Sequence, residues 1–181
     1  MPNFASGNKK RYKMKPTAIF YGSTSGNCES IARKIGEALG VGASDIYSAS
    51  ELDAAKLGQY DNLLLGSSTW GCGDLQDEWY DAVEVLKGAD LSGKQVAVFG
   101  CGDSCGFGST FCNAMATIYD AAKGAGATMI GDGVDAAGYS FDDSEAVRDG
   151  KFVGLALDED NESDLTDSRI AAWVGEIAPK L

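Results

Sequence analysis

Short apolar runs alternate with amphipathic helical patterns along most of this chain. The run Ile19–Tyr21 has the apolar and aromatic character of a strand, and Gly22 ends it. Ile31, Ile35 and Leu39 then recur every four residues, which is typical of one face of a helix. Because the alternation is repeated toward the C-terminus, we expect a doubly wound α/β sandwich around a parallel sheet.

Further strands and helices follow from the same two patterns. Residues 62–66 form a continuous apolar run, which suits a parallel strand covered on both faces. A polar, Gly-rich and acidic segment separates Ile130 from Phe152, and residues 152–155 indicate that the fifth strand resumes there. The remaining strands are expected at 45–48, 95–100 and 128–130, and a short helix at 53–59. Apolar residues at helical spacing predict three more helices. The first pattern is Leu75, Trp79, Val83 and Leu86; the second is Phe111, Met115, Ile118 and Ala122; the third is Ile170, Trp173, Val174 and Ile177.

The length of 181 residues suits one domain with a substantial core, and the sequence has no internal repeat. The basic stretch 1–15 lacks hydrophobic periodicity, so we expect a flexible tail before a single domain at 16–181. No apolar run reaches membrane-spanning length, and no signal-peptide pattern is present. We therefore expect a soluble, intracellular protein without membrane insertion.

Charge and composition exclude several classes of function. The 15 Lys and Arg residues against 27 Asp and Glu residues give a net charge of −12, which repels nucleic acid and anionic membranes and favours basic protein partners. The absence of His excludes His-based acid–base catalysis, Ser–His and Cys–His nucleophile pairs and His metal ligands. The five Cys fit neither a zinc nor an iron–sulfur pattern, so we expect free thiols.

A turn of small, mostly polar residues connects the first expected strand to the first helix. It contains Ser23, Thr24, Ser25, Gly26 and Asn27. Backbone N–H groups lie at the positive end of the helix dipole, and hydroxyls add further donors, so the turn is a candidate phosphate seat. The turn holds no Lys or Arg, so it would bind a phosphate by hydrogen bonds and not by ionic charge. The alternative is an ordinary capped turn, since Ser, Thr and Asn are favoured helix caps.

Two further loops follow the expected strands at 62–66 and 95–100. The first presents Trp70 among small residues, and the second presents Asp103 and Phe107 among glycines. In open α/β sheets, ligands bind beside the carboxyl ends of the strands, where these loops meet the hydroxyl-rich turn. An anion seat with two aromatic side chains favours a planar, phosphorylated ligand. The alternative is that both rings only cover the edge of the sheet.

Three stretches resemble the phosphate loop and the two ring-binding loops of flavodoxins. They are residues 23–32, 68–71 and 100–107, in the order of that family. Residues 150–161 and an insertion at 131–151 resemble the long-chain subgroup, in which an insertion splits the fifth strand. The resemblance covers residues 17–181 and implies a flavodoxin-like five-stranded parallel sheet in the order 2-1-3-4-5 with helices on both faces.

The same resemblance implies a bound FMN. It places the ribityl phosphate at the hydroxyl-rich turn and the flavin between Trp70 and Phe107. It also places Gly71 near flavin N5 and Asp103 at the pyrimidine edge. Two residues depart from the family pattern, because Cys28 replaces the usual Thr and Phe107 the usual Tyr. The cofactor-binding residues expected in this way are Ser23, Thr24, Ser25, Gly26, Asn27, Cys28, Ser68, Thr69, Trp70, Gly71, Cys101, Gly102, Asp103 and Phe107.

By this resemblance the chain is a low-potential, single-electron carrier and not an enzyme. It would shuttle electrons between redox proteins in place of ferredoxin, as a monomer in a bacterial cytoplasm or an algal chloroplast stroma. Its expected partners are basic proteins such as a ferredoxin/flavodoxin-NADP reductase or photosystem I. Two alternatives stay open, an NAD(P)H-dependent quinone or flavin reductase of the same fold and an interaction module without FMN. The acidic charge argues against the reductase, because it repels a nicotinamide dinucleotide.

Overall fold

A mostly parallel sheet is the centre of the fold in the computed structural model, which describes residues 14–181. Its five principal strands are β1 (Thr17–Gly22), β2 (Ile46–Ser48), β3 (Asn62–Trp70), β5 (Gln95–Cys101) and β10 (Leu155–Leu157). They follow the order β10-β5-β3-β1-β2, and every neighbouring pair is parallel. The expected strand order is therefore confirmed. Most of the expected tail, residues 1–13, lies outside the described residues.

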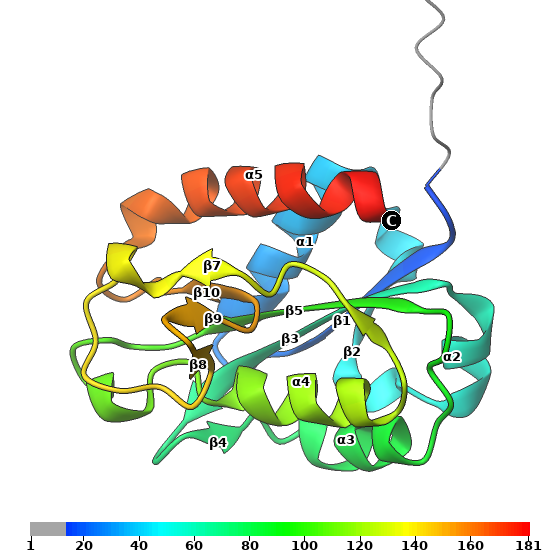
Figure 1. The fold of residues 1–181 in the computed structure, drawn as a ribbon, viewed down its shortest axis with the longest axis horizontal. Coiled ribbons are helices and arrows are strands. Elements are labelled where there is room, and N and C mark those ends of the chain that lie inside the picture. The colour runs from blue at the N-terminus through cyan, green and yellow to red at the C-terminus, as the bar shows by residue number, and fades with distance from the viewer. Residues whose placement is uncertain (1–13) are drawn as a thin grey trace, which may run out of the picture.

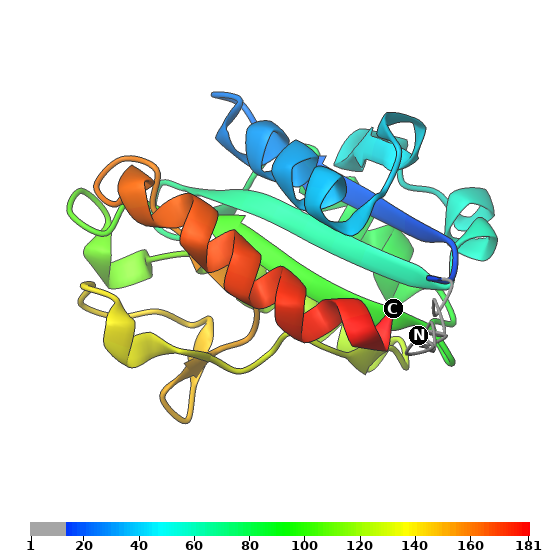
Figure 2. The same cartoon turned by 90° about the horizontal axis from the view of Figure 1, so that it is seen from above.

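Helices cover both faces of this sheet (Figure 1). Helices α1 (Asn27–Leu39) and α5 (Thr166–Ile177) lie side by side on one face, as the view from above shows (Figure 2). Helices α3 (Trp79–Lys87) and α4 (Ala114–Gly124) cover the other face, and the short α2 (Ala54–Gln59) leads into β3. The doubly wound α/β architecture is confirmed.

The last strand of the sheet is built in two pieces. Strand β6 (Thr128–Met129) pairs with the start of β5, and β10 pairs with its end. The expected resumption at 152–155 is thus wrong in its bounds, because Phe152 belongs to a separate small sheet. At Gly154 the chain passes so close to β5 that a Cβ atom would lie 2.1 Å from the carbonyl oxygen of Val98. The split strand expected from the sequence is confirmed.

The insertion between these two pieces folds into a small antiparallel sheet in the order β7-β9-β8. It packs an aromatic cluster in which the Phe111 and Phe141 ring centroids are 5.4 Å apart and those of Tyr139 and Phe152 are 4.8 Å apart. This cluster joins the insertion to the main core. The strands of the small sheet are β7 (Val134–Asp135), β8 (Val147–Arg148) and β9 (Lys151–Phe152).

Two loops differ from the sequence prediction. Residues 67–70, expected as a loop, continue β3, because Ser67 and Ser68 still pair with β5 and Trp70 pairs with Asp74. Leu75, expected on the following helix, belongs to the short β4 (Asp74–Leu75), which makes an antiparallel pair with the end of β3. These pairings hold Trp70 at the edge of the sheet.

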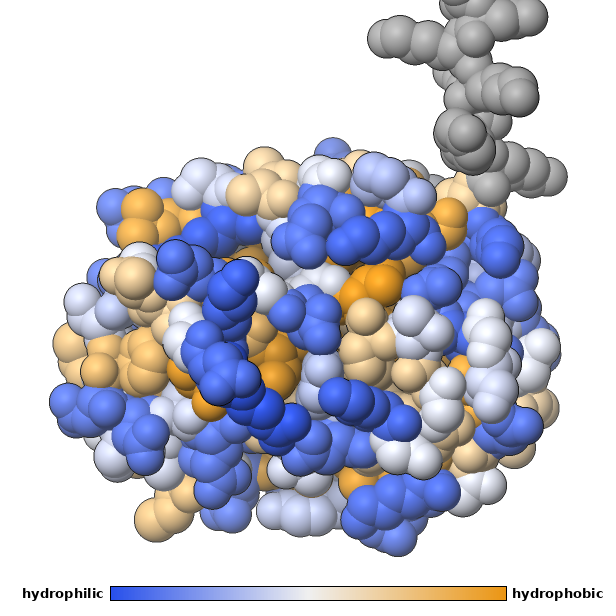
Figure 3. Space-filling model, viewed as in Figure 1, coloured by the Kyte–Doolittle hydropathy of each residue, from blue (hydrophilic) through white to orange (hydrophobic). Residues whose placement is uncertain are grey.

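The strands alternate their side chains between two hydrophobic layers. Ile19 and Leu64 face α1 and α5, whereas Phe20 and Leu65 face α3 and α4. Polar side chains cover most of the outer face shown in Figure 3, with smaller hydrophobic areas between them. Within residues 14–181, no helix has the length and apolar character needed to cross a membrane.

Candidate functional site

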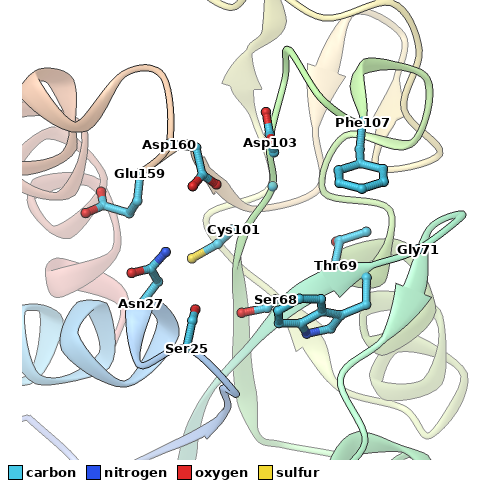
Figure 4. Close-up of a pocket in the computed structure, with 12 residues that line it drawn as sticks. Ser25, Asn27, Ser68, Thr69, Gly71, Cys101, Asp103, Phe107, Glu159 and Asp160 are labelled. Carbon is cyan, nitrogen blue, oxygen red and sulfur yellow. The ribbon is translucent and has the colours of Figure 1, made fainter.

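A cavity of about 310 Å³ opens at the carboxyl ends of the central strands. This volume lies in the range of small-molecule sites. The loops after β1, β3, β5 and β10 meet here because parallel strands present their carboxyl ends at one edge. The residues that line the cavity are Ser25, Asn27, Ser68, Thr69, Trp70, Gly71, Cys101, Gly102, Asp103, Phe107, Glu159 and Asp160 (Figure 4).

The cavity has two rims of different charge. We call the residues after β1 and at the end of β3 the neutral rim, since none of them is charged: Ser25, Asn27, Ser68, Thr69, Trp70 and Gly71. We call the residues after β5 and β10 the acidic rim: Asp103, Phe107, Glu159 and Asp160. Cys101 and Gly102 form the floor between them. In Figure 4, Ser25 and Ser68 lie on one side of the cavity, and Asp103 and Phe107 lie on the opposite side.

The hydroxyl-rich turn leaves the start of α1 open. Gly26 precedes the helix with a φ of 93°, and no side chain caps the helix there. The first N–H groups of a helix have no partner within the helix, so they are free to bind an anion. The Ser23 Oγ accepts a hydrogen bond from the Gly26 N–H at 3.0 Å, and the Thr24 Oγ1 accepts one from the Gln76 Nε2 at 3.0 Å. These two hydroxyls therefore brace the turn, and Ser25 and Asn27 face the cavity.

Two aromatic side chains on opposite rims are open to solvent. Trp70 is 41% exposed and Phe107 is 53% exposed, although burial of large apolar side chains is favourable. Rings that only covered the edge of the sheet would be buried against it, so the packing alternative is not supported. The turn after Trp70 is tight, with the Gly73 N–H donating to the Trp70 carbonyl at 3.0 Å and a positive φ of 51° at Gly71.

A buried carboxylate holds the two loops of the acidic rim together. Asp158 is 1% exposed and accepts hydrogen bonds from the Ser104 N–H at 3.2 Å and from the Ser104 Oγ. It also accepts the backbone N–H groups of Asp160 at 3.2 Å and Asn161 at 3.0 Å. The loop after β10 is thereby fixed to the loop after β5.

Hydrogen bonds also shift the acidity of this rim. Asp103 accepts the Gly106 N–H at 2.8 Å, the Asn161 Nδ2 at 2.9 Å and the Cys105 N–H at 3.1 Å. These bonds hold the pKa of Asp103 below its ordinary value. Asp160 behaves in the opposite way: its side chain is exposed, but partial desolvation by the surrounding loops and the neighbouring carboxylates raise its pKa.

The side chain of Cys28, which the family resemblance places at the phosphate, does not face the cavity. Its side chain is fully buried, and its Sγ lies 3.2 Å from the Sγ of Cys101. Only the backbone N–H of Cys28 remains at the open start of α1. Hydrogen bonding to Cys28 and burial raise the pKa of the Cys101 thiol well above its ordinary value. All five Cys are free thiols, which confirms that expectation.

The structure brings most of the expected residues together and adds two. Ser23 and Thr24 brace the turn with their hydroxyls, Gly26 supplies its left-handed backbone, the Cys28 side chain is buried in the core, and the other ten expected residues line the cavity. Glu159 and Asp160 were missed. The sequence feature that could have identified them is their position just after the last strand, because that strand lies next to β5 in the sheet.

The fold is that of a doubly wound α/β protein, with a cavity at the carboxyl ends of its strands that has two exposed aromatic rings and an uncapped helix start on its walls. A family model described as flavodoxin matches residues 19–173. A flavodoxin of Synechocystis sp. is 41% identical over 169 residues, which cover 93% of this chain and 99% of that relative. Flavodoxin 1 of Azotobacter vinelandii is 42% identical over 165 residues, which cover 89% and 94%. The chain therefore belongs to the flavodoxin family, whose members are FMN electron carriers rather than enzymes.

Solved structures agree with this assignment. Fusobacterium nucleatum flavodoxin bound to flavin mononucleotide superposes with a TM-score of 0.83 at 29% identity, over 93% of this chain and 99% of that one. The K13G mutant of that protein, also bound to flavin mononucleotide, gives a TM-score of 0.84. The expected family, fold and cofactor are confirmed.

Proposed function

We propose that the FMN of this electron carrier binds in the cavity between the neutral rim and the acidic rim. The observation that carries the proposal is the pair Trp70 and Phe107, two exposed rings on opposite rims of one cavity. Aromatic side chains placed in this way stack on a planar ligand and remove their own apolar surface from water. Trp70 thus covers one face of the flavin and Phe107 covers the other.

The phosphate of FMN binds at the open start of α1. The uncapped backbone N–H groups of the first turn, together with Ser25 and Asn27, supply the donors. The lining residues include no Lys or Arg, so the phosphate is held by hydrogen bonds and by the helix dipole. A dianion held in this way stays on the neutral rim, away from Asp103.

FMN supplies reversible transfer of single electrons when it is bound. The residues of the chain bind and orient it and set the electrostatic field around it. The carboxylates of Asp103, Glu159 and Asp160, within a chain of net charge −12, oppose the arrival of further negative charge. This field supports a low midpoint potential and hence service in place of ferredoxin.

The partners of this carrier are redox proteins, and we propose that they present basic surfaces. The net charge of −12 supports this proposal, because it attracts positively charged proteins and repels anionic ones. A ferredoxin/flavodoxin-NADP reductase and photosystem I are the candidates, in a bacterial cytoplasm or a chloroplast stroma. The bacterial sources of the relatives favour the first compartment.

Substitution of Trp70 tests the site directly. We expect Trp70→Ala to weaken FMN binding roughly 10- to 100-fold, the scale of one lost stacking contact. The control is Tyr80→Ala on α3, which removes an aromatic ring of similar exposure, 52%, outside the cavity and leaves the affinity unchanged. Calorimetric titration of the FMN-free chain measures both. Equal affinities for wild type and Trp70→Ala would overturn the placement of the flavin.

Kinetics test the choice of partners and the alternative reductase. The loaded chain should accept electrons from NADPH only when a ferredoxin-type reductase is added. The second-order rate should fall as salt rises, because the Debye length shortens to about 8 Å at 0.15 M. Oxidation of NADPH by the chain alone would favour the quinone or flavin reductase. A rate independent of salt would contradict basic partners.

A further inference from the structure

Two buried thiols meet beneath the cavity. Cys28 lies in the first turn of α1, and Cys101 is the last residue of β5, 73 positions later. Their Sγ atoms are 3.2 Å apart. A disulfide bond is about 2.05 Å long, so an approach of roughly 1 Å joins them. Neither thiol has a part in the electron transfer proposed above.

The two thiols differ in access. Cys101 lines the floor of the cavity and is 6% exposed, whereas Cys28 is 0% exposed and lies in the hydrophobic layer beneath α1. A small oxidant in the cavity therefore reaches Cys101 first, with Cys28 behind it. The third buried thiol, Cys112, is directed instead toward the carbonyl oxygen of Leu157, 3.9 Å away.

We propose that Cys28 and Cys101 form a reversible disulfide when the cavity is empty and a peroxide is present. The reacting form of Cys101 is the thiolate, which is a minor form because hydrogen bonding to Cys28 and burial raise the pKa of this thiol, so the reaction is slow and speeds up as the pH rises. The Cys101 sulfur attacks hydrogen peroxide, an S–O bond forms, the O–O bond breaks, and one water leaves with the thiol proton. The Cys28 sulfur then attacks the Cys101 sulfur, the S–S bond forms, the S–O bond breaks, and a second water leaves with the Cys28 proton. The two sulfurs lose two electrons, and the peroxide is reduced to two waters.

A ligand in the cavity controls this reaction by covering Cys101. This gating rests on the proposed function, whereas the crosslink itself does not. The disulfide ties the start of α1 to the end of β5 and closes a long loop, which restricts the unfolded chain. The crosslinked chain without FMN should therefore unfold at a higher urea concentration than the reduced chain.

The test uses the full chain with Cys72→Ser and Cys105→Ser, which removes the two exposed thiols. FMN-free and FMN-saturated samples receive hydrogen peroxide, and unfolding, alkylation and peptide mass mapping follow. We expect the FMN-free chain to lose two of its three remaining thiols, to yield a peptide pair linked through Cys28 and Cys101, and to recover both thiols with dithiothreitol. The FMN-saturated chain should react at least roughly tenfold more slowly, since the cofactor blocks the route.

Two controls make the result specific. Addition of Cys28→Ser should abolish the crosslink and drive Cys101 to the sulfinic acid, and Cys28→Ala should behave in the same way. Peroxide treatment in urea should give mixed pairs that include Cys112, because the native pairing depends on the fold. Cys112 should stay reduced in the folded chain.

Three outcomes would overturn parts of the proposal. Retention of both thiols in the FMN-free chain, or pairing of Cys101 with Cys112, overturns the disulfide. Equal crosslinking rates with and without FMN overturn the gating alone. The absorbance of the loaded chain reports separately whether FMN binds, so failure of the site and failure of the thiol pair are distinguishable.

Discussion

The two rims of the cavity stabilise their loops by different means. The neutral rim depends on backbone geometry, with Gly26 in a left-handed conformation and an uncapped helix start. The acidic rim depends on side-chain charge, with Asp158 and Asp103 collecting donors from both of its loops. The neutral rim therefore offers free N–H donors to an anion, whereas the N–H donors of the acidic rim already bind its own carboxylates.

This difference orients an anionic ligand within one cavity. A phosphate gains hydrogen bonds on the neutral rim and meets repulsion on the acidic rim. Substitutions on the two sides should therefore differ in what they change. Loss of a carboxylate from the acidic rim should change stability or potential, whereas substitution of Gly26 at the start of α1 should change affinity as well as stability.

The largest effect is expected at Asp158. Its replacement by Ala leaves buried N–H and O–H donors without a charged acceptor, so the free energy of unfolding should fall by about 2–4 kcal/mol. Urea denaturation measures the loss. The exposed neighbour Asp160→Ala is the control and should change the free energy of unfolding by less than about 0.5 kcal/mol. Similar losses in both variants would mean that Asp158 does not hold the acidic rim together.

The neutral rim can be tested with two glycines at the ends of α1. Gly26 and Gly40 have φ values of 93° and 76°, and a Cβ atom at either position meets no other atom within 4 Å. Gly26→Ala and Gly40→Ala should each destabilise the fold by about 1–2 kcal/mol through left-handed strain. Only Gly26→Ala should also weaken FMN binding, roughly tenfold. Equal FMN affinities in the two variants would show that the phosphate does not bind at this turn.

The acidic rim should set the redox potential. Asp103→Asn and Asp160→Asn each remove one negative charge and should raise the midpoint potential by roughly 20–40 mV, equivalent to about 0.5–1 kcal/mol for one electron. Potentiometric titration of the FMN-loaded chain measures this change. Glu37→Gln, in the last turn of α1, is the matched control and should leave the potential unchanged. A lowered potential in the Asp variants would reverse the assigned role.

The smallest effect concerns the Asn161 amide, whose Nδ2 donates to Asp103 at 2.9 Å and to the two carboxylate oxygens of Asp158 at 3.1 and 3.0 Å. Removal of the Asn161 amide should raise the pKa of Asp103 toward its ordinary value, because one donor to the carboxylate is lost. A lowered pKa stabilises the fold above the unfolded-state pKa, and this contribution is lost as the pH falls through the folded-state pKa. Asn161→Ala should therefore show a weaker loss of stability in acid.

Carboxyl NMR titration follows the pKa of Asp103 in both proteins. Asp90, whose pKa is lowered by hydrogen bonds from Ser92, is an internal reference that should not move. An unchanged pKa of Asp103 would show that the backbone donors of Gly106 and Cys105 are sufficient alone.

Local sequence signals were enough for the parts of the site that are local. The hydroxyl-rich turn, Trp70 and Phe107 each follow a strand that its apolar run reveals, and all reach one edge through the parallel order of the sheet. Glu159 and Asp160 were missed because the start of β10 depends on pairing with β5, 56 residues earlier at Leu155 and Phe99. No nearby pattern encodes that register.

Cys28 shows a different kind of error. Its spacing to Ile31, Ala32 and Ile35 already places it on the buried face of α1, and all four side chains are buried there. The sequence therefore contained the signal for a buried side chain, whereas the resemblance to the family, which usually has Thr at this position, implied a contact with the phosphate. The continuation of β3 to Trp70 was missed because Ser67, Ser68 and Thr69 lack apolar character, and pairing with β5 and β4 decides their conformation.

Two residues of the acidic rim, Glu159 and Asp160, follow a strand at the edge of the sheet. Strand β10 has three residues and pairs with β5 alone, at the edge of the sheet. Edge strands open before central ones, so amide hydrogen exchange should begin here while β1 and β3 remain protected. Each opening of β10 carries Asp158 away from Ser104 and loosens one side of the cavity. We therefore expect the lifetime of a bound ligand to follow local unfolding at this edge and not the global stability of the domain.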